Sequence, residues 1–470
     1  MNDLSQLSGK ELQEKLTWEA PNIAEKTPEQ FEEAAAFCEG YKRFLDRAKT
    51  EREFVRETVK LIEAAGYRAF DPQAQYKAGD KVYVNNRGKA MILTTFGTKG
   101  AAQGVRINAA HIDSPRLDLK PSPLYEKSDL ALFKTHYYGG IRKYQWTATP
   151  LALHGVVMKR GGGTAEICIG EDPADPVFCV SDLLPHLAAE QNKRTLAEGI
   201  KGEELNVIVG SLPFADDEKL KEPVKLMVLK LLYEKYGITE KDFIRAEIEM
   251  VPAVKARDVG LDRSMVGAYG QDDRVCAYAA LKALLDLNQV PEKTAVCVLA
   301  DKEEIGSDGV TGMQSAAFDT FMEDLCESQG VPVRVCFEKS FCLSADVTAA
   351  YDPNFSDVYE KRNAAYLNYG IGLCKYTGAR GKSGASDASA ELVAYVRKVL
   401  DENGVIWQMA ELGKVDAGGG GTVAMFMAER NIDTLDAGVP VLSMHSPFET
   451  VGKLDCYMTF KGMKAIYEAR

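Results

Sequence analysis

The sequence contains no long hydrophobic run and no excess of positive charge. Its longest apolar stretches, such as residues 294–300, are far too short to span a bilayer. Its 57 lysines and arginines are outnumbered by 69 aspartates and glutamates, which gives a formal net charge of −12 at pH 7. No basic surface is therefore expected that could neutralise the phosphates of a nucleic acid. These absences argue against both a membrane and a nucleic acid as partners.

Signals for export and for thiolate metal sites are also missing. The first residues, MNDLSQLSGKELQEKL, lack the basic region and following apolar region of a secretory signal, so we expect a cytoplasmic protein. The ten cysteines include no Cys-x-x-Cys pair, which argues against a zinc site built from thiolates. Most of them, such as Cys168, Cys276, Cys297 and Cys342, lie in apolar runs, and we expect their side chains to be reduced and buried.

Two further motifs of catalysis and binding are absent. No Gly-x-Ser-x-Gly segment is present, so the sequence gives little support for a serine nucleophile. The glycine-rich run at 416–424, DAGGGGTVA, lacks the Lys-Ser/Thr pair of a phosphate-binding loop, which argues against nucleotide binding. Its glycines either bring backbone close to a substrate or form a flexible turn before a helix.

The chain is long enough, at 470 residues, for two or three domains. Its 46% of hydrophobic and 27% of charged residues are typical of a globular protein with an ordinary core. Between residues 119 and 257 the sequence pattern changes, because glycines at 139–140 and 161–163 separate short strand-like segments. We predict that residues 119–257 form an inserted, β-rich second domain, and that residues 1–118 and 258–470 form the main domain.

The rest of the chain alternates between strand-like and helix-like segments. Strand-like runs at 90–95, 105–109, 265–269, 294–300, 341–345, 406–411 and 439–444 are interspersed with helical patterns at 274–287, 388–400 and 422–429. Such alternation predicts an α/β main domain with a doubly wound, mostly parallel sheet that helices cover on both faces.

Five of these runs end in side chains that can bind a metal ion. These side chains are His111, Asp272, the pair Glu303 and Glu304, Asp346 and His445. In an open α/β sheet the carboxyl ends of the strands meet at one crevice, where ligands bind. The five strand ends are therefore predicted to converge on one site, although each acid alone is more often a turn or helix-cap residue.

Two imidazoles and several carboxylates suit a pair of divalent ions. Each ion could take one histidine and one carboxylate of its own, with a further carboxylate shared between them. Zinc is the expected metal, and cobalt and manganese accept the same ligands. Glu303 and Glu304 are adjacent, so in a strand they point in opposite directions. One of them should bind metal while the other faces the attacking water as a general base.

At these residues the sequence resembles the aspartyl-aminopeptidase family. Five segments carry the resemblance: AAHIDSPRL at 109–117, QDDRVCAY at 271–278, DKEEIGS at 301–307, SADV at 344–347 and MHSPFET at 444–450. The resemblance implies a metal-dependent aminopeptidase that acts on peptides. It also implies that the main domain is the peptidase domain and that residues 119–257 serve dimerisation and assembly. A homo-oligomer built from dimers, as large as a tetrahedral dodecamer, is expected.

The resemblance also implies a role for each matching residue. His111 and Asp346 would bind one ion, Glu304 and His445 the other, and Asp272 would bridge the two. Glu303 would be the general base, and Asp113 would orient His111, a common support for a metal-bound imidazole. In related two-metal exopeptidases the peptide bond after the bridging aspartate is cis, which predicts a cis Asp272–Asp273 bond.

One part of the family pattern is missing. Many members carry two histidines after the residue that corresponds to Asp346, whereas this chain has DVTAAYDPNF with Ala349 and Asp352 at those places. Strict selectivity for acidic N-terminal residues is therefore in question. Lys375 and Arg380 could instead pair with a substrate carboxylate, or belong to a solvated loop of charges.

Two other functions compete with an aminopeptidase. A carboxypeptidase or deacylase on the same scaffold would use the same ions and the same base. A non-catalytic assembly protein of this fold would keep the architecture and dispense with turnover. Activity on free-amine and N-acylated substrates separates these three functions.

Overall fold

A computed structural model describes residues 4, 7–216 and 220–469 of the chain. Its largest element is a nine-stranded sheet, whose four central strands β14, β4, β15 and β19 run parallel to one another. In spatial order the sheet consists of β1 (Arg68–Ala69), β2 (Lys81–Asn86), β3 (Ala90–Thr95), β14 (Ala295–Ala300), β4 (Arg106–His111), β15 (Phe341–Ser344), β19 (Asp433–Gly438), β17 (Ile371–Cys374) and β18 (Trp407–Met409).

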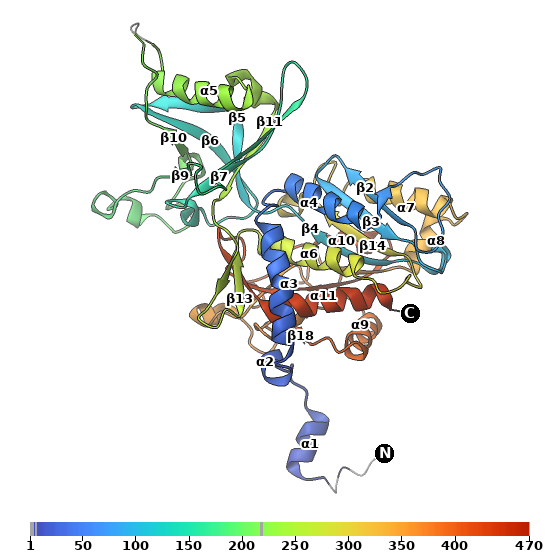
Figure 1. The fold of residues 1–470 in the computed structure, drawn as a ribbon. Coiled ribbons are helices and arrows are strands. Elements are labelled where there is room, and N and C mark those ends of the chain that lie inside the picture. The colour runs from blue at the N-terminus through green and yellow to red at the C-terminus, as the bar shows by residue number, and fades with distance from the viewer. Residues whose placement is uncertain (1–3, 5–6, 217–219, 470) are drawn as a thin grey trace.

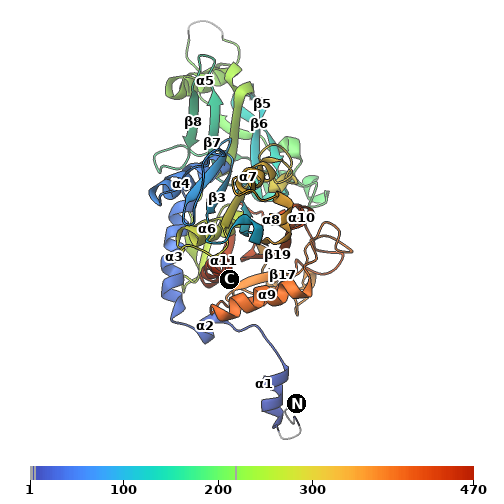
Figure 2. The ribbon, with the colours of Figure 1, turned by 90° about the vertical axis from the view of Figure 1, so that its right-hand side faces the viewer.

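Helices cover both faces of this sheet (Figures 1 and 2), so the doubly wound α/β prediction is confirmed. The sequence of β14, AVCVLA, is apolar throughout because both of its faces are buried. Cys297 packs on one face, and its neighbours Val296 and Val298 pack on the other. The first face carries α3 (Gln30–Leu45), α4 (Glu51–Ala64), α6 (Gln271–Leu285), α9 (Ala390–Glu402) and α11 (Lys453–Glu468), and the second carries α7 (Ala317–Glu327), α8 (Val333–Glu338) and α10 (Val423–Glu429).

A seven-stranded antiparallel sheet stands apart from the large sheet at the upper left of Figure 1. Its strands, in spatial order, are β8 (Thr164–Ile169), β7 (Leu151–Met158), β11 (Ala246–Pro252), β5 (Arg116–Lys127), β6 (Leu130–Tyr138), β10 (Val207–Gly210) and β9 (Cys179–Val180). Helix α5 (Pro223–Tyr236) covers it through Val224, Val228 and Leu232. Strand β5 begins at Arg116, so the predicted boundary between residues 118 and 119 falls inside a strand, and the division into domains stays a prediction.

A small five-stranded sheet corrects one part of the sequence analysis. It contains β12 (Arg257–Val259), β13 (Met265–Ala268), β21 (Glu449–Gly452), β20 (Pro440–Leu442) and β16 (Thr348–Ala349). The runs that precede Asp272 and His445 were predicted in the parallel sheet, but they form β13 and β20 of this five-stranded sheet. The reason is that a single apolar run does not identify its partner strands, and pairing depends on tertiary contacts.

The N-terminal segment leaves the body of the protein. Helix α1 (Gly9–Leu16) projects away from the sheets (Figures 1 and 2), and α2 (Ile23–Lys26) follows it. Trp18, between the two helices, stacks on Trp407 with ring centroids 4.8 Å apart. Among the described residues, no helix combines the length and the apolar character that a membrane crossing requires.

All ten cysteines are free, as predicted, and eight of them are buried. Cys168 is an exception, because it is exposed on β8 although its neighbours Ile167 and Ile169 are apolar and buried. The strand has one face in the core and one face outside, so alternate residues differ in exposure.

Candidate active site

Three parallel strands deliver four of the predicted site residues to one edge of the large sheet. Strand β4 ends at His111, which lies in register with Ala300 at the end of β14. The short 3-10 helix η8 (Glu303–Ile305) follows β14 and carries Glu303 and Glu304. Strand β15 ends at Ser344, two residues before Asp346. These four side chains therefore meet because the carboxyl ends of neighbouring parallel strands share an edge.

The other two candidate ligands come from the five-stranded sheet. Asp272 lies in the first turn of α6, just after β13, and the Asp272–Asp273 peptide bond is cis, as predicted. His445 lies in the connection between β20 and β21. Strands β13 and β21 pair directly, with Ala268 opposite Glu449, so the two segments reach the same place.

Asp272 lies between the two imidazoles. Its Oδ1 is 3.1 Å from Nε2 of His111, and its Oδ2 is 3.1 Å from Nε2 of His445. Each carboxylate oxygen thus faces a different histidine, which is the arrangement that a carboxylate shared by two cations requires.

Further carboxylates stand beside each imidazole. Nε2 of His111 lies 3.8 Å from Oδ1 of Asp346 and 3.8 Å from Oε2 of Glu303. Nε2 of His445 lies 3.5 Å from Oε2 of Glu304. The two glutamates therefore face different histidines, and the roles predicted for them stay a prediction.

Asp113 holds the other side of His111. Nδ1 of His111 lies 3.1 Å from the backbone oxygen of Asp113 and 3.3 Å from its Oδ1. The backbone N–H groups of Glu303 and Glu304 donate to the two oxygens of the same carboxylate, each at 3.2 Å. Tyr138 donates its hydroxyl to Asp113 Oδ2 at 2.7 Å. Asp113 therefore fixes one imidazole and both glutamates at once.

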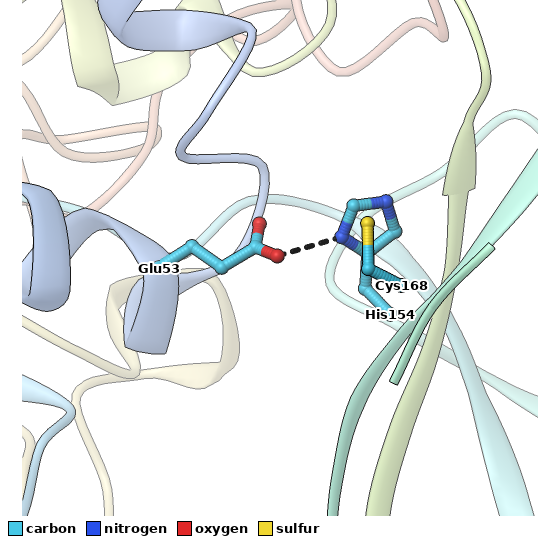
Figure 3. Close-up of side chains that lie close together, drawn as sticks. All are labelled: Glu53, His154 and Cys168. Atoms are coloured by element: carbon cyan, nitrogen blue, oxygen red, sulfur yellow. Dashed lines mark hydrogen bonds and ion pairs between the residues drawn. The ribbon is translucent and has the colours of Figure 1, made fainter. Parts of the chain in front are cut away.

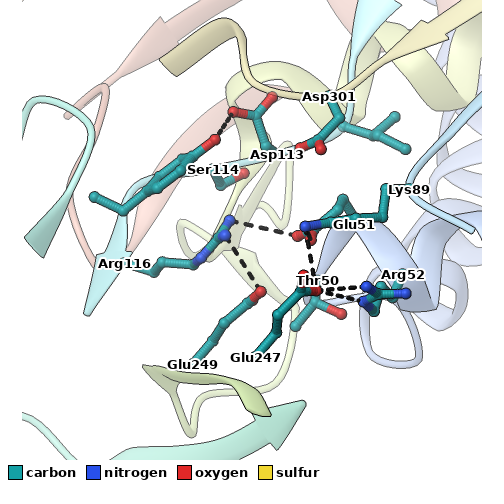
Figure 4. Close-up of polar contacts among 12 residues, drawn as sticks. Thr50, Glu51, Arg52, Lys89, Asp113, Ser114, Arg116, Glu247, Glu249 and Asp301 are labelled. Atoms are coloured by element: carbon teal, nitrogen blue, oxygen red, sulfur yellow. Dashed lines mark hydrogen bonds and ion pairs between the residues drawn. The ribbon is translucent and has the colours of Figure 1, made fainter. Parts of the chain in front are cut away.

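A buried network of ion pairs packs against Tyr138 and so supports the residue that donates to Asp113 (Figure 4). The guanidinium of Arg116 lies 4.0 Å from the ring of Tyr138 and pairs with Glu51 at 3.4 Å and Glu249 at 3.2 Å. Lys89 pairs with Glu51 at 3.2 Å. Buried charges of this kind are costly to break, since removal of one partner leaves the other uncompensated.

Three residues that contribute to the site were missed in the sequence. Tyr138 is the last residue of β6 and Gly140 lies two residues after it, where the carbonyl of Gly140 is 2.7 Å from Nδ1 of His445. Glu449 accepts the backbone N–H of His445 at 2.6 Å and that of Asp272 at 3.2 Å. Glu449 lies inside the segment MHSPFET and could have been singled out there, whereas nothing in the sequence near Tyr138 pointed to Asp113.

Burial and crowding of acids shift the proton affinities in the site. Burial alone lowers the pKa of His111, but the surrounding acids, Asp113 and Asp272 foremost, raise it well above its usual value. Burial raises the pKa of Glu303 to about 7 and, together with Asp272, raises the pKa of Glu304 well above its usual value. Burial alone raises the pKa of Asp272, but hydrogen bonds from the two histidines hold this pKa below its usual range.

The side chains fit divalent cations. His111, Asp272 and Glu304 form one group whose ligand atoms all lie within 4.8 Å of one another, and His111, Asp273 and Asp346 form a second. Oε1 of Glu304 is buried with no hydrogen-bond partner among the described residues. Imidazole and carboxylate together are the ligand set of zinc and similar ions. Asp273, which the sequence analysis did not name as a ligand, is thus an additional carboxylate at this place.

The candidate ligands open into a cavity of about 370 Å³. Its described lining contains five carboxylates, Asp272, Glu303, Glu304, Asp346 and Asp436, and no lysine or arginine. Lys375 does not line it, and Arg380 lines a smaller neighbouring hollow of about 60 Å³. The structure therefore does not bring these two cations to the other site residues, and their role in specificity stays a prediction.

Comparison with known proteins places this site in context. The family model described as "Aminopeptidase I zinc metalloprotease (M18)" matches residues 44–467. A probable M18 family aminopeptidase 1 from Clostridium acetobutylicum is 50% identical over 444 residues, which cover 93% of this chain and 95% of the relative.

Solved structures share the whole fold. The crystal structure of an M18-family aminopeptidase from Thermotoga maritima has a TM-score of 0.91 and 47% identity, and the match covers 97% of this chain and 100% of that one. The structure of the S. cerevisiae mApe1 dodecamer has a TM-score of 0.76 at 21% identity, covering 94% and 97% of the two chains. The second likeness concerns the fold alone.

Proposed function

Because the chain belongs to the aminopeptidase I family of zinc metalloproteases (M18) and is an aminopeptidase, we propose that it hydrolyses peptides with two divalent ions, one on each side of Asp272. His111 and Asp346 would hold one ion, Glu304 and His445 would hold the other, and Asp272 would be shared between them. The observation that carries the proposal is that each oxygen of Asp272 faces a different imidazole at 3.1 Å. Zinc is the expected metal, with cobalt and manganese as substitutes.

Each residue has a definite task in the proposed reaction. Bound ions of this kind lower the pKa of water towards 7 and polarise a carbonyl, by general precedent. Glu303 accepts the proton of the attacking water and returns it to the amine that leaves. A glutamate suits both steps, because its carboxylate accepts a proton and the resulting carboxylic acid can donate it again. Asp113 acts as a positioning residue, because it orients His111 and the backbone of both glutamates.

The charge of the cavity favours a free N-terminus over the alternatives. Five carboxylates line the cavity, and four of them are assigned above to metal ions or to proton transfer. Asp436 remains to attract the ammonium group of a substrate. A carboxypeptidase needs a cation for the C-terminal carboxylate, and the described lining contains no lysine or arginine. A deacylase would have no ammonium group to bind.

Matched substrates test this choice. We expect an amino-acid anilide with a free amine to be hydrolysed about 10- to 100-fold faster than its N-acetyl form. A buried charge-assisted hydrogen bond contributes about 1.5–3 kcal/mol, and each 1.4 kcal/mol is about tenfold. Values of kcat/KM for both substrates, measured with zinc, cobalt and manganese, provide the comparison. Faster cleavage of the acetylated substrate would assign a deacylase, and no turnover with any metal would favour an assembly protein.

We also propose that the chain assembles into a homo-oligomer built from dimers. The support is the fold shared with the mApe1 dodecamer, although the identity to that chain is only 21%. A tetrahedral dodecamer is the largest form expected, and light scattering measures the mass directly.

A further inference from the structure

A second cluster of metal-ligating side chains lies where helix α4 meets the seven-stranded sheet. His154 on β7 is the direct cross-strand partner of Cys168 on β8, so their side chains lie on the same face of the sheet. Glu53, on α4, points at this pair from the other side (Figure 3). Oε1 of Glu53 lies 2.8 Å from Nδ1 of His154, and one ligand atom from each residue lies within 4.8 Å of the others.

Glu53 is held in place before any ligand arrives. Its Oε2 accepts the backbone N–H groups of Lys49 at 2.9 Å and Thr50 at 3.2 Å, as part of the capping box of α4. This leaves Oε1 directed at His154. A carboxylate that is fixed by backbone donors loses little freedom when its second oxygen binds an ion.

The opposite nitrogen of His154 is supported by a carboxylate. Nε2 of His154 lies 3.1 Å from Oε1 of Glu171. Glu171 is itself anchored by Lys49 and Lys255, each at 2.6 Å. An imidazole that donates one N–H to a fixed carboxylate and offers its other nitrogen outward is the usual arrangement of a metal-bound histidine.

We propose that Glu53 Oε1, His154 Nδ1 and Cys168 Sγ bind a divalent metal ion such as zinc or cobalt. This site is separate from the site around Asp272. One oxygen, one nitrogen and one sulfur suit a borderline ion such as zinc or cobalt. A carboxylate and a thiolate neutralise its two charges, while the charge of Glu171 is already offset by two lysines. The site lies in a hollow of about 250 Å³, which leaves room for a water or an external ligand as fourth partner.

Binding of the ion would release two protons and would link two parts of the molecule. The ion replaces the proton on Nδ1 of His154 and the proton of the Cys168 thiol, and both are released to solvent. The guanidinium of Arg56 lies 3.8 Å from Glu53 Oε1 and 2.9 Å from Glu166. When Glu53 Oε1 binds the ion, Arg56 therefore still has Glu166 as an ion-pair partner. Since α4 packs on the large sheet whereas β7 and β8 belong to the seven-stranded sheet, the ion would tie the two parts of the molecule together.

Cobalt(II) supplies a signal that reports this site alone. The full-length protein is stripped of metal, loaded with cobalt(II), and its near-ultraviolet absorption is recorded for a thiolate-to-cobalt charge-transfer band. The ligands proposed around Asp272 include no sulfur. We expect the band in the unaltered protein. We expect Cys168→Ser to lose the band and to bind one equivalent of cobalt less per chain, while its aminopeptidase activity stays unchanged.

Cys179→Ser is the matched control, because Cys179 is half-buried in the same sheet and lies outside the cluster. It should keep both the band and the full cobalt content. Glu53→Gln should keep the band and bind cobalt at least about tenfold more weakly, since it loses an anionic ligand. No band in the unaltered protein would overturn the proposal, and so would a band that persists in Cys168→Ser. The readout is independent of peptide hydrolysis, so its failure leaves the proposed function untouched.

Discussion

Replacement of Glu303 by glutamine should abolish most turnover and leave the metal content unchanged. Glutamine keeps the shape of the side chain but cannot accept a proton, and general acid–base catalysis contributes about 10²–10⁴-fold. The expected result is therefore a fall in kcat of this size at saturating metal, with KM little altered. Steady-state kinetics on an amino-acid anilide and metal analysis of the same sample provide the two readouts.

Glu304→Gln is the matched control for this prediction, because the two residues are neighbours on η8 and face different histidines. Glu304→Gln should lose metal as well as activity, since Glu304 is assigned as a ligand. If Glu303→Gln kept near-normal turnover, the water would be deprotonated by another group. If Glu303→Gln lost metal as Glu304→Gln does, the roles of the two glutamates would be wrong.

Replacement of Asp272 by alanine should have the second large effect, on the metal content itself. One oxygen of Asp272 faces each of the two imidazoles, so its loss removes a ligand from each ion. We expect the variant to bind both ions at least about tenfold more weakly and to lose activity at ordinary metal concentrations. Titration of metal-free protein with zinc measures both affinities.

His445→Ala provides the comparison for Asp272→Ala. His445 contacts Glu304 and Asp272 but is not among the groups around His111, so its loss should weaken one ion and spare the other. Asp272 is buried, so the replacement of its side chain requires a check on folding. Circular dichroism of each variant provides this check. Two ions bound with unaltered affinity in Asp272→Ala would refute the bridging role.

The large sheet could be predicted from the sequence because its strands are buried on both sides. A run such as AVCVLA in β14 offers apolar residues to both faces, and this pattern identifies a central parallel strand without knowledge of its neighbours. His111 is the last residue of such a strand, and Glu303, Glu304 and Asp346 lie within a few residues after one. Their convergence depended only on the rule that parallel strands end at one edge.

The route that brings Asp272 and His445 to the site was not predictable. Their strands, β13 and β20, lie in a separate sheet in which both pair with β21, and no local pattern reveals this pairing. Tyr138 and Gly140 contribute from the end of β6, far along the chain from the residues they support. Cys168 is exposed because the other face of β8 packs on the core. The sequence of the strand does not reveal which of its two faces is buried.

Anomalous diffraction from crystals of the zinc-loaded protein, recorded at the zinc absorption edge, locates the proposed ions themselves. We expect two peaks at the edge of the large sheet, one beside each oxygen of Asp272, with His111 on the first and His445 on the second. A single peak bound by both histidines, or zinc bound to neither of them, would contradict the proposal of two ions.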